Sequence, residues 1–430
     1  MKEKLALFSL VLLVLLSGCS SVPAQKPSES SSPAVSQGPS QPEAPSEENS
    51  GQEQKPGSTA PPVITVEETE IKAAEIEKLF CESGTPTAIM KNGDLILWGG
   101  NVFNGIGNGK DGEEEIGPFP PTRHRFPAPV VDAFSSVVSY AVTEDGDLYG
   151  WGRNYFRQLG QEKERVLTRP QKLELGFRVK QAISPGPFSL YLTDQGDVYC
   201  TGLDITGYQS LNEFNRSVGR NDEDDFETGL RMLELPFTCR RVEASAISHV
   251  FLSEDGEVYY QGLLLGDHSY TAPDFYHKTP EKIVFPEKVI DIAVTDFNVI
   301  ALSESGKVYV YGHPLSGVSD AQTDIPVAED LYQKRLENIV AISSGEFAAM
   351  AISREGRVYC WGLDMRGVVD EKNNTGDPPT GFELIPEPRD MGYTGVISGM
   401  MGNYNGTALC EDGSAYIWGD NCIGQIIELK

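Results

Sequence analysis

The stretch TEDGDLYGWGRNYFRQLGQ, residues Thr143–Gln161, joins an Asp-Gly pair to a short run of residues that ends in Trp-Gly. Glycine after Asp supplies the positive φ that a tight hairpin turn requires. Leu148, Tyr149 and Trp151 favour an extended strand after that turn. The stretch therefore predicts a hairpin, and further copies of it would indicate a repeat.

Seven segments of the chain follow this pattern: KNGDLILWG, EDGDLYGWG, DQGDVYCTG, EDGEVYYQG, ESGKVYVYG, REGRVYCWG and EDGSAYIWG. Each has a turn glycine and a second glycine six residues later. The pairs are Gly93/Gly99, Gly146/Gly152, Gly196/Gly202, Gly256/Gly262, Gly306/Gly312, Gly356/Gly362 and Gly413/Gly419. All four tryptophans of the chain directly precede a second glycine. The opening stretch is thus one unit of a sevenfold repeat.

Successive turn glycines lie 50 to 60 residues apart, close to the length of one four-stranded propeller blade. The spacing predicts an all-β fold, a seven-bladed β-propeller of four-stranded antiparallel blades over residues 62–430. The last repeat is short of one strand, and a strand-like segment lies near Val63–Val66. We expect that segment to complete the last blade, so that the termini meet and no sheet edge stays open.

The repeats resemble the regulator of chromosome condensation repeat, through Gly-x-Val/Leu-Tyr-x-Trp-Gly and through Asn-x-x-x-Gln-Leu-Gly at Asn154–Gly160. That family forms seven-bladed propellers, so the resemblance implies the same fold. The chain departs from the family where a histidine is usual in Gly-x-x-His-x-x-Ala-Leu. The corresponding residues are Thr85, Val138, Phe188, Ser248, Asn298, Ala348 and Asn405.

The first residues of the chain predict export. Lys2 and Lys4 precede the apolar run Leu5–Leu16, which is too short to span a bilayer comfortably and is typical of a signal peptide. Leu16–Cys19 (LSGC) resembles the lipobox of bacterial lipoproteins, which implies a signal peptide over residues 1–18 and lipidation of Cys19. A cleaved secretory signal with a chance cysteine is the alternative. The expected location is extracytoplasmic, with the lipid anchor as the sole attachment to the bacterial cell membrane.

Residues 19–61 predict a disordered tether. Serine and proline dominate the segment, and it contains no aromatic residue. Such a composition buries too little apolar surface to offset the entropy lost on ordering. We expect the tether to hold the propeller away from the membrane.

Charge and export exclude the roles of the family's founding member, a nuclear exchange factor for a small GTPase that docks on chromatin. The chain has 63 acidic and 35 basic residues, a formal net charge of −28. Such a charge repels nucleic acid at long range. An exported protein does not meet the GTPase.

The motifs of common catalytic and cofactor sites are missing from the sequence. The five histidines, His124, His249, His268, His277 and His313, show no metal-ligand spacing. We therefore predict no catalytic residue, no metal and no cofactor. Two acidic clusters, Gly109–Glu115 and Asn221–Glu227, lack the ligand pattern of an EF-hand, so solvated loops are favoured over calcium sites. Catalysis by residues that converge in the central channel stays open.

The cysteines after Cys19 allow one firm deduction. Cys200 and Cys360 occupy the same position three blades apart, so they lie across the ring and cannot bond. Cys81, Cys410 and Cys422 fall in the first and last blades. A disulfide among them and free buried thiols both stay open.

The segments after each second glycine are expected to emerge on one rim, where aromatic residues and arginine would anchor a partner. The candidates are Asn101, Phe103, Asn154, Tyr155, Phe156, Arg157, Asp204, Asp364, Arg366 and Asn421. We interpret the chain as a monomeric surface lipoprotein whose propeller binds or scaffolds an unknown protein or cell-wall component.

Two other functions stay open. An exported bacterial β-lactamase inhibitor uses the same repeat family, which implies inhibition of a β-lactamase or penicillin-binding enzyme through one loop face. A glycan-processing enzyme is the third candidate, and carboxylates that converge in the channel would indicate it.

Overall fold

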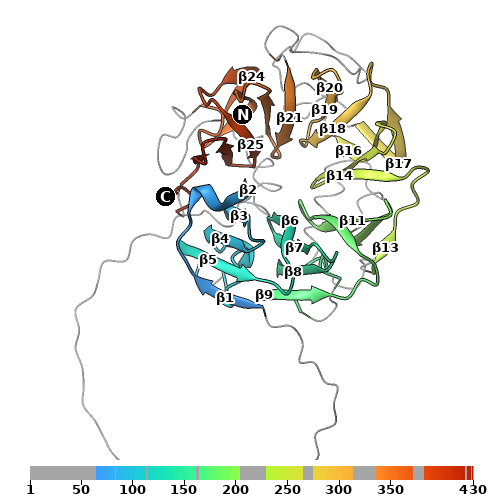
Figure 1. The fold of residues 1–430 in the computed structure, drawn as a ribbon. Coiled ribbons are helices and arrows are strands. Elements are labelled where there is room, and N and C mark those ends of the chain that lie inside the picture. Colours follow the sequence, from blue (N-terminus) through green and yellow to red (C-terminus); the bar gives the residue numbers. More distant parts are fainter. Residues whose placement is uncertain are drawn as a thin grey trace, which may run out of the picture.

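The computed structural model describes residues 64–82, 84–112, 115–160, 164–203, 229–264, 275–312, 336, 338–370, 382–421, 424–427 and 429. In these residues the chain forms seven antiparallel sheets arranged in a ring (Figure 1). Two short 3₁₀ segments, η1 (Ala73–Glu75) and η2 (Val102–Asn104), are the described helices. None of the described helices is long and apolar enough to span a membrane. The predicted all-β, seven-bladed propeller is confirmed. The signal peptide, Cys19 and the tether lie outside the described residues.

Each blade begins with an inner strand and continues outward through successive hairpins. The first blade contains β2 (Ile76–Phe80), β3 (Thr87–Met90), β4 (Leu95–Gly99) and β5 (Phe119–Arg125), and the second contains β6 (Val130–Ser135), β7 (Val138–Thr143), β8 (Leu148–Arg153) and β9 (Val166–Leu173). The third blade contains β10 (Val179–Ile183), β11 (Phe188–Thr193), β12 (Val198–Gly202) and β13 (Arg231–Met232). The fourth contains β14 (Cys239–Ser245), β15 (Ser248–Ser253), β16 (Val258–Leu264) and β17 (Phe275–Ile283). The fifth blade contains β18 (Val289–Val294), β19 (Asn298–Ser303) and β20 (Val308–Gly312). The sixth contains β21 (Ile339–Ser344), β22 (Ala348–Ser353), β23 (Val358–Met365) and β24 (Phe382–Asp390). The seventh contains β25 (Val396–Met401), β26 (Asn405–Cys410) and β27 (Ala415–Gly419). The fifth and seventh blades have three strands each in the described residues.

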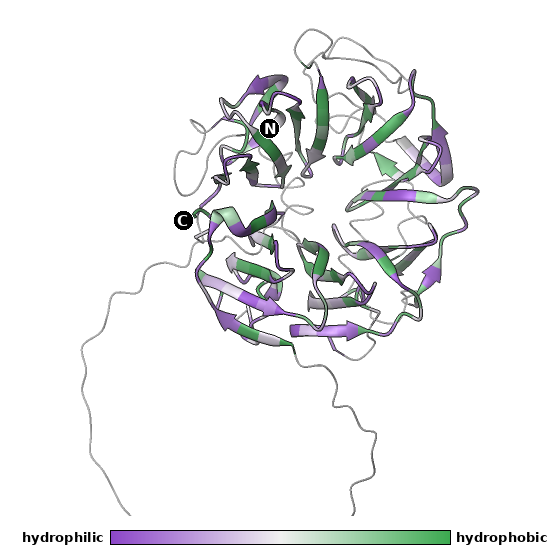
Figure 2. Cartoon of the chain, in the orientation of Figure 1, coloured by the Kyte–Doolittle hydropathy of each residue, from purple (hydrophilic) through white to green (hydrophobic). Residues whose placement is uncertain are grey.

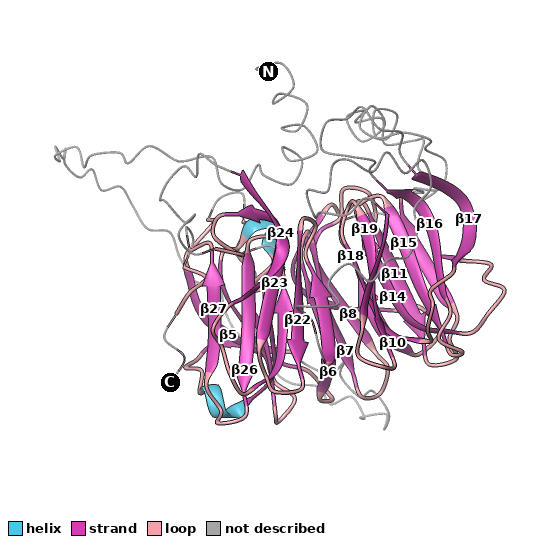
Figure 3. Ribbon diagram, turned by 90° about the horizontal axis from the view of Figure 1, so that it is seen from above, coloured by secondary structure: helices cyan, strands magenta, loops and turns pink. Residues whose placement is uncertain are grey.

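The strands run between the two faces of the ring (Figure 3). One face carries the hairpins with the turn glycines, and we call it the hairpin face. The other face carries the turns between inner and second strands and the segments after each second glycine. We call it the loop face. The apolar sides of the blades pack against each other, while the outer strands β1 (Thr65–Glu68), β5 and β9 are largely hydrophilic (Figure 2).

Each second glycine permits a close approach between two turns of its blade. Gly362 has φ 118°, and a Cβ there would lie 2.5 Å from the carbonyl oxygen of Phe347. The next residue, Leu363, donates its N–H to that same oxygen at 2.9 Å. Any larger residue would push the third strand away from the turn.

The tryptophans tie neighbouring blades together. Trp151 Nε1 donates to Gly105 O at 2.7 Å, and Trp418 Nε1 donates to Val368 O at 2.9 Å. Each acceptor lies six residues after the second glycine of the preceding blade. The tryptophan of the Trp-Gly motif therefore joins its own blade to a loop of the preceding blade.

The same contact closes the ring between the seventh and first blades. Trp98 Nε1 donates to Gln425 O at 2.9 Å. Thr407 Oγ1 in β26 donates to Leu79 O in β2 at 2.8 Å. The seam is thus built like the other junctions.

The predicted completion of the last blade by Val63–Val66 is wrong. β1 pairs instead with β5, with Thr65 opposite Arg125, and forms a fifth outer strand on the first blade. Glu67 holds it there through an ion pair of 2.8 Å to Arg125. The charge of β5 favours the acidic strand β1 at this edge.

The described cysteines, Cys81, Cys200, Cys239, Cys360 and Cys410, are free and buried. The deduction that Cys200 and Cys360 are not bonded is confirmed. Cys81 and Cys410 are likewise not bonded to each other. Cys422 lies outside the described residues.

Candidate functional site

Five of the ten predicted partner-binding residues share one position, two residues after the second glycine, and four of them are described. The side-chain oxygen of each accepts the backbone N–H of the residue five positions later: Asn101 from Ile106 (3.1 Å), Asn154 from Leu159 (2.9 Å), Asp364 from Val369 (2.9 Å) and Asn421 from Ile426 (2.8 Å). The first three are buried and Asn421 is exposed. These hydrogen bonds within each loop fix its backbone conformation. Asp204 occupies the same position but lies outside the described residues.

Two aromatic candidates of the first two blades, Phe103 and Tyr155, form a cluster on the loop face with Arg153, which was not among the predicted residues. The Arg153 guanidinium lies 4.6 Å from the ring centre of Phe103 and 5.4 Å from that of Tyr155. Phe103 is buried, Tyr155 is 45% exposed, and Phe156 and Arg157 are half-buried. We call Phe103, Arg153 and Tyr155 the first arginine–aromatic cluster.

Arg366 forms a second cluster at the junction of the sixth and seventh blades. Its guanidinium lies 2.9 Å from Asp420 Oδ2 and 5.3 Å from the ring centre of Tyr404. Both arginines are held in place before any partner arrives, which lowers the entropy lost on binding. Contact of any of these residues with a partner stays a prediction.

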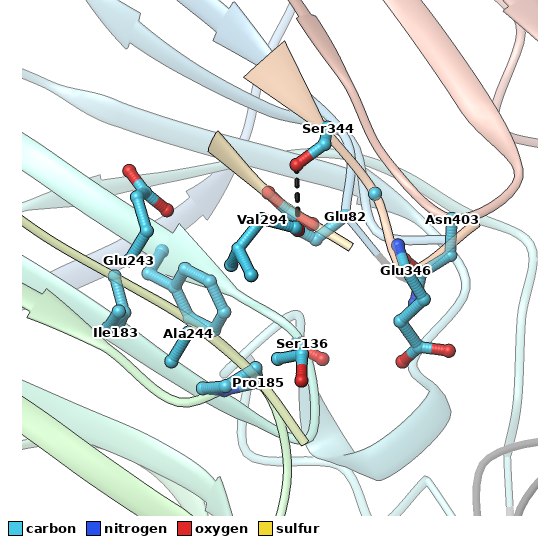
Figure 4. Close-up of a pocket in the computed structure, with 13 residues that line it drawn as sticks. Glu82, Ser136, Ile183, Pro185, Glu243, Ala244, Val294, Ser344, Glu346 and Asn403 are labelled. Carbon is cyan, nitrogen blue, oxygen red and sulfur yellow. Dashed lines mark hydrogen bonds between the residues drawn. The ribbon is translucent and has the colours of Figure 1, made fainter. Parts of the chain in front are cut away.

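A cavity of about 50 Å³ lies where the central channel opens on the loop face (Figure 4). Residues from all seven blades line it, among them Glu82, Ser136, Glu243, Glu346 and Asn403. We call this cavity the channel mouth. Sequence reasoning did not single out these residues.

Asp296 lies beside the channel mouth between two lining residues. The Ser245 side chain and the Glu346 carboxyl are close enough to influence its pKa, and the Asp296 backbone N–H donates to Glu346 O at 3.0 Å. Asp296 is only 4% exposed. Its Oδ1 atom is buried and accepts no hydrogen bond from the part of the chain that the structure describes.

Ion pairs neutralise the neighbouring carboxylates along the channel. Arg241 lies 2.7 Å from Glu243 and 3.1 Å from Asp291, and Lys78 lies 3.7 Å from Asp132. Among the described residues, no lysine or arginine forms an ion pair with Glu82, Asp296 or Glu346. The channel mouth therefore concentrates three carboxyl groups without a basic partner.

Burial is the main cause of the shifted pKa values in the channel mouth. It raises the pKa of Glu82 to about 8 and the pKa of Asp296 to about 7. The pKa of Glu346 is raised well above its usual range by burial and by the nearby Asp296. These groups hold protons at a pH where exposed carboxyls have lost theirs.

A regular spacing could have revealed part of this cluster. Asp296, Glu346, Asn403 and Ser136 each stand ten residues before the turn glycine of their blade. The spacing places them at the turns between inner and second strands, around one axis. Glu82 and Glu243 depart from it, so the full cluster emerges only in the folded ring.

Carboxylates do converge in the channel, as the glycan-processing alternative requires. The cavity is nevertheless far smaller than the roughly 300–1,000 Å³ of typical ligand pockets. It suits a small head group better than a glycan chain.

The described residues contain no group of three or more His, Cys, Asp or Glu placed to hold a metal ion. In the first acidic cluster Lys110 pairs with Glu115 at 2.9 Å. The cluster Asn221–Glu227 lies outside the described residues. His124 and His249 are buried among aromatic rings.

Two segments of the chain, residues 145–188 and 339–367, match family models described as the regulator of chromosome condensation (RCC1) repeat. The chain carries RCC1 repeats. The first segment contains the glycine pair of the second blade and the other contains that of the sixth blade, so the resemblance seen in the sequence is confirmed.

The RCC1 repeats are also similar to parts of larger proteins. The probable E3 ubiquitin-protein ligase HERC4 of Homo sapiens is 26% identical over 192 residues, which are 44% of this chain and 17% of HERC4. The mitochondrial RCC1 domain-containing protein RUG3 of Arabidopsis thaliana is 31% identical over 128 residues, 28% of this chain and 29% of RUG3. The chain thus spans less than a third of the length of either relative.

Solved structures agree on the fold. Human WBSCR16 has a TM-score of 0.59 at 19% identity, with 77% of this chain and 91% of that chain covered. Prp20p of Saccharomyces cerevisiae has a TM-score of 0.58 at 15% identity, with 83% and 94% covered. At such identities the likeness concerns the propeller alone.

Proposed function

We propose that this RCC1-repeat propeller is a protein-binding module, displayed outside the cell membrane by a lipidated N-terminus. The observation that carries the binding role is the pair of arginine–aromatic clusters on the loop face. Arginine and tyrosine are enriched among the residues that contribute most to protein interfaces. We expect a binding role without turnover.

Proteins with a similar fold support a protein partner. The structure of Prp20p is described together with its binding properties to Gsp1p and histones, and yeast RCC1 (Prp20) is seen with Kap60 bound to it. We transfer only the general mode, recognition of a protein by a propeller. The net charge of −28 argues against a nucleic-acid ligand.

The lipid anchor is tested by feeding cells an alkyne-tagged fatty acid. We expect the full chain to incorporate the tag and the Cys19→Ala variant to lose it. A wild-type chain without the tag would rule out the anchor. Cys81→Ala is a matched control, because that thiol is buried in the folded ring and should not change labelling.

The partner is tested by chemical crosslinking on intact cells that carry the tagged full chain, followed by mass spectrometry of the captured proteins. We expect one protein to be enriched over cells with an unrelated lipoprotein. Loss of capture when Tyr155→Ala and Arg366→Ala are combined supports binding of the partner through the loop face. Unchanged capture by the double variant contradicts binding through this face.

Inhibition of a β-lactamase or a penicillin-binding enzyme is a narrower form of the same proposal. The exposed Tyr155 beside the fixed Arg153 is the feature that fits an enzyme's active-site rim. Activity assays of both enzyme classes, with and without the purified full chain, distinguish this inhibition from binding to another kind of partner. Inhibition that the Tyr155→Ala variant weakens supports this form, and full enzyme activity at saturating propeller excludes it for the enzymes tested.

A further inference from the structure

We propose that the channel mouth binds an ammonium group. This inference goes beyond the partner-binding role of the loop face, because it concerns the axis of the ring and a defined chemical group. It does not depend on the lipid anchor or on the arginine–aromatic clusters.

The first argument is the buried acceptor on Asp296. Its Oδ1 atom is buried without a hydrogen bond from the described residues, in a side chain that is 4% exposed. A buried acceptor without a partner is costly, and native proteins rarely keep one without a functional reason. The Asp296 backbone N–H donates to Glu346 O at 3.0 Å, so this carboxyl group adjoins a residue that lines the channel mouth.

The second argument is that three carboxyl groups along the channel lack a basic partner among the described residues. Arg241 and Lys78 already pair with Glu243, Asp291 and Asp132. Glu82, Asp296 and Glu346 have no such pairing among the described residues. A cation from outside the chain would complete the pattern of the channel.

The third argument is the size and geometry of the cavity. An ammonium group is compact and offers three N–H donors to surrounding oxygens. The 50 Å³ cavity gives room for such a group, and Ser136, Ser344 and Asn403 add neutral oxygens to the lining. A bare metal ion is disfavoured, because the described carboxylates do not converge to coordinating positions.

Ammonium binding in the channel mouth must release protons. The raised pKa values of Glu82, at about 8, and Asp296, at about 7, mean that both hold protons near neutral pH. The neighbouring carboxyl groups of Asp296 and Glu82 raise the pKa of Glu346 further. Glu243 also raises the pKa of Glu82, while Arg241 keeps Glu243 paired. The affinity should therefore rise from about pH 6 to about pH 8.

The test is isothermal titration of the purified full chain with n-butylammonium chloride, and separately with the capped peptide acetyl-Gly-Lys-Gly-amide. We expect saturable binding of at least one probe, with proton release that appears as a dependence of the heat on the buffer. Glu346→Gln and Asp296→Asn should each weaken binding by about tenfold or more. Circular dichroism checks that both variants keep the strand-rich fold.

Glu355→Gln is the matched control. Glu355 lies in the same blade as Glu346, but in the exposed hairpin turn on the hairpin face. Its substitution should leave binding unchanged. Equal weakening by Glu355→Gln would show a nonspecific effect of net charge and overturn the proposal.

The two probes separate the possible sources of the ammonium group. If the lysine peptide binds more tightly than n-butylammonium, the natural ligand is a lysine side chain of a protein. If n-butylammonium binds at least as tightly as the peptide, the natural ligand is a free amine. Absence of saturable binding by both probes overturns the proposal. So does binding that survives Glu346→Gln and Asp296→Asn. The loop-face proposal would stand in either case, because its test uses other residues.

Discussion

Thr201 stands where four other blades carry tryptophan, and it preserves the contact that the tryptophan makes. Its hydroxyl donates to Gln158 O, six residues after the second glycine of the preceding blade. Trp151 and Trp98 donate to Gly105 O and Gln425 O in the same way. At the four junctions where both residues are described, this position supplies a hydrogen bond to the preceding blade, with or without an indole ring.

Trp98→Phe tests that contact. Phenylalanine keeps most of the packing but removes the donor, which leaves Gln425 O without its partner. We expect a loss of about 1–3 kcal/mol in the free energy of unfolding, measured by urea titration. Tyr416→Phe, at an exposed position, should change it little. Equal stability of Trp98→Phe and the wild type would contradict this role.

Gly362→Ala and Gly392→Ala separate backbone conformation from close approach. Both glycines have positive φ, 118° and 80°, but only Gly362 has a carbonyl oxygen at 2.5 Å from the position of a Cβ. We expect Gly392→Ala to cost about 1–2 kcal/mol, and Gly362→Ala to cost about 1–3 kcal/mol more. Thermal unfolding of the pair measures the difference. Equal costs would mean that the contact with Phe347 is relaxed easily.

Sequence reasoning predicted the glycines and tryptophans well, because each has one chemical task that recurs in register. It did not predict the channel mouth. The turn position ten residues before the turn glycine holds Ser136, Asp296, Glu346 or Asn403 in different blades. These residue types share no local pattern, and only closure of the ring brings them together.

At the scale of elements, the C-terminal segment makes the seam contact that the sequence analysis expected from the N-terminal strand. β1 is an exposed edge strand on the first blade, attached mainly through β5. Residues after Gly419 supply the seam contact, because Gln425 accepts from Trp98 and Ile427 and Leu429 pack on the seam core. The number of blades was predictable from the repeat, but the pairing of the charged strand β1 with β5 was not.

Paired truncations test the role of the C-terminal segment. Deletion of residues 1–70 removes β1, and we expect a folded ring with little loss of stability. Deletion of residues 424–430 removes the acceptor of Trp98 and its apolar cover, and we expect a loss of about 3 kcal/mol or more. Urea unfolding of the two variants compares them. A larger loss on deletion of β1 would show that the N-terminal strand, not the C-terminal segment, secures the seam.

At the scale of the whole molecule, the ring brings seven turns to one axis and encloses carboxyl groups that no single blade would bury. The cost of their desolvation appears in the dependence of stability on pH. Glu82 and Asp296 hold protons in the folded ring up to about pH 8 and about pH 7, whereas the unfolded chain releases them near pH 4. The folded state therefore binds more protons, and its stability falls as pH rises through this window.

We expect the free energy of unfolding to fall from about pH 5 to about pH 8. His124 opposes the trend below about pH 6.5, because burial lowers its pKa to about 4 and the unfolded chain takes up its proton first. Glu346→Gln should reduce the fall and make the ring more stable than the wild type at the alkaline end. Urea titrations across this range measure both slopes. A wild-type stability that rises up to pH 8 would contradict the buried, protonated state of these carboxyls.

The central claim is that this ring binds a protein through its loop face. The most direct measurement places a photo-crosslinking residue, p-benzoylphenylalanine, at position 155 on the loop face or at position 355 on the hairpin face of the full chain in living cells. The account predicts a discrete adduct with one protein from position 155 and none from position 355. An adduct from position 355 alone, or no adduct from position 155, would contradict it.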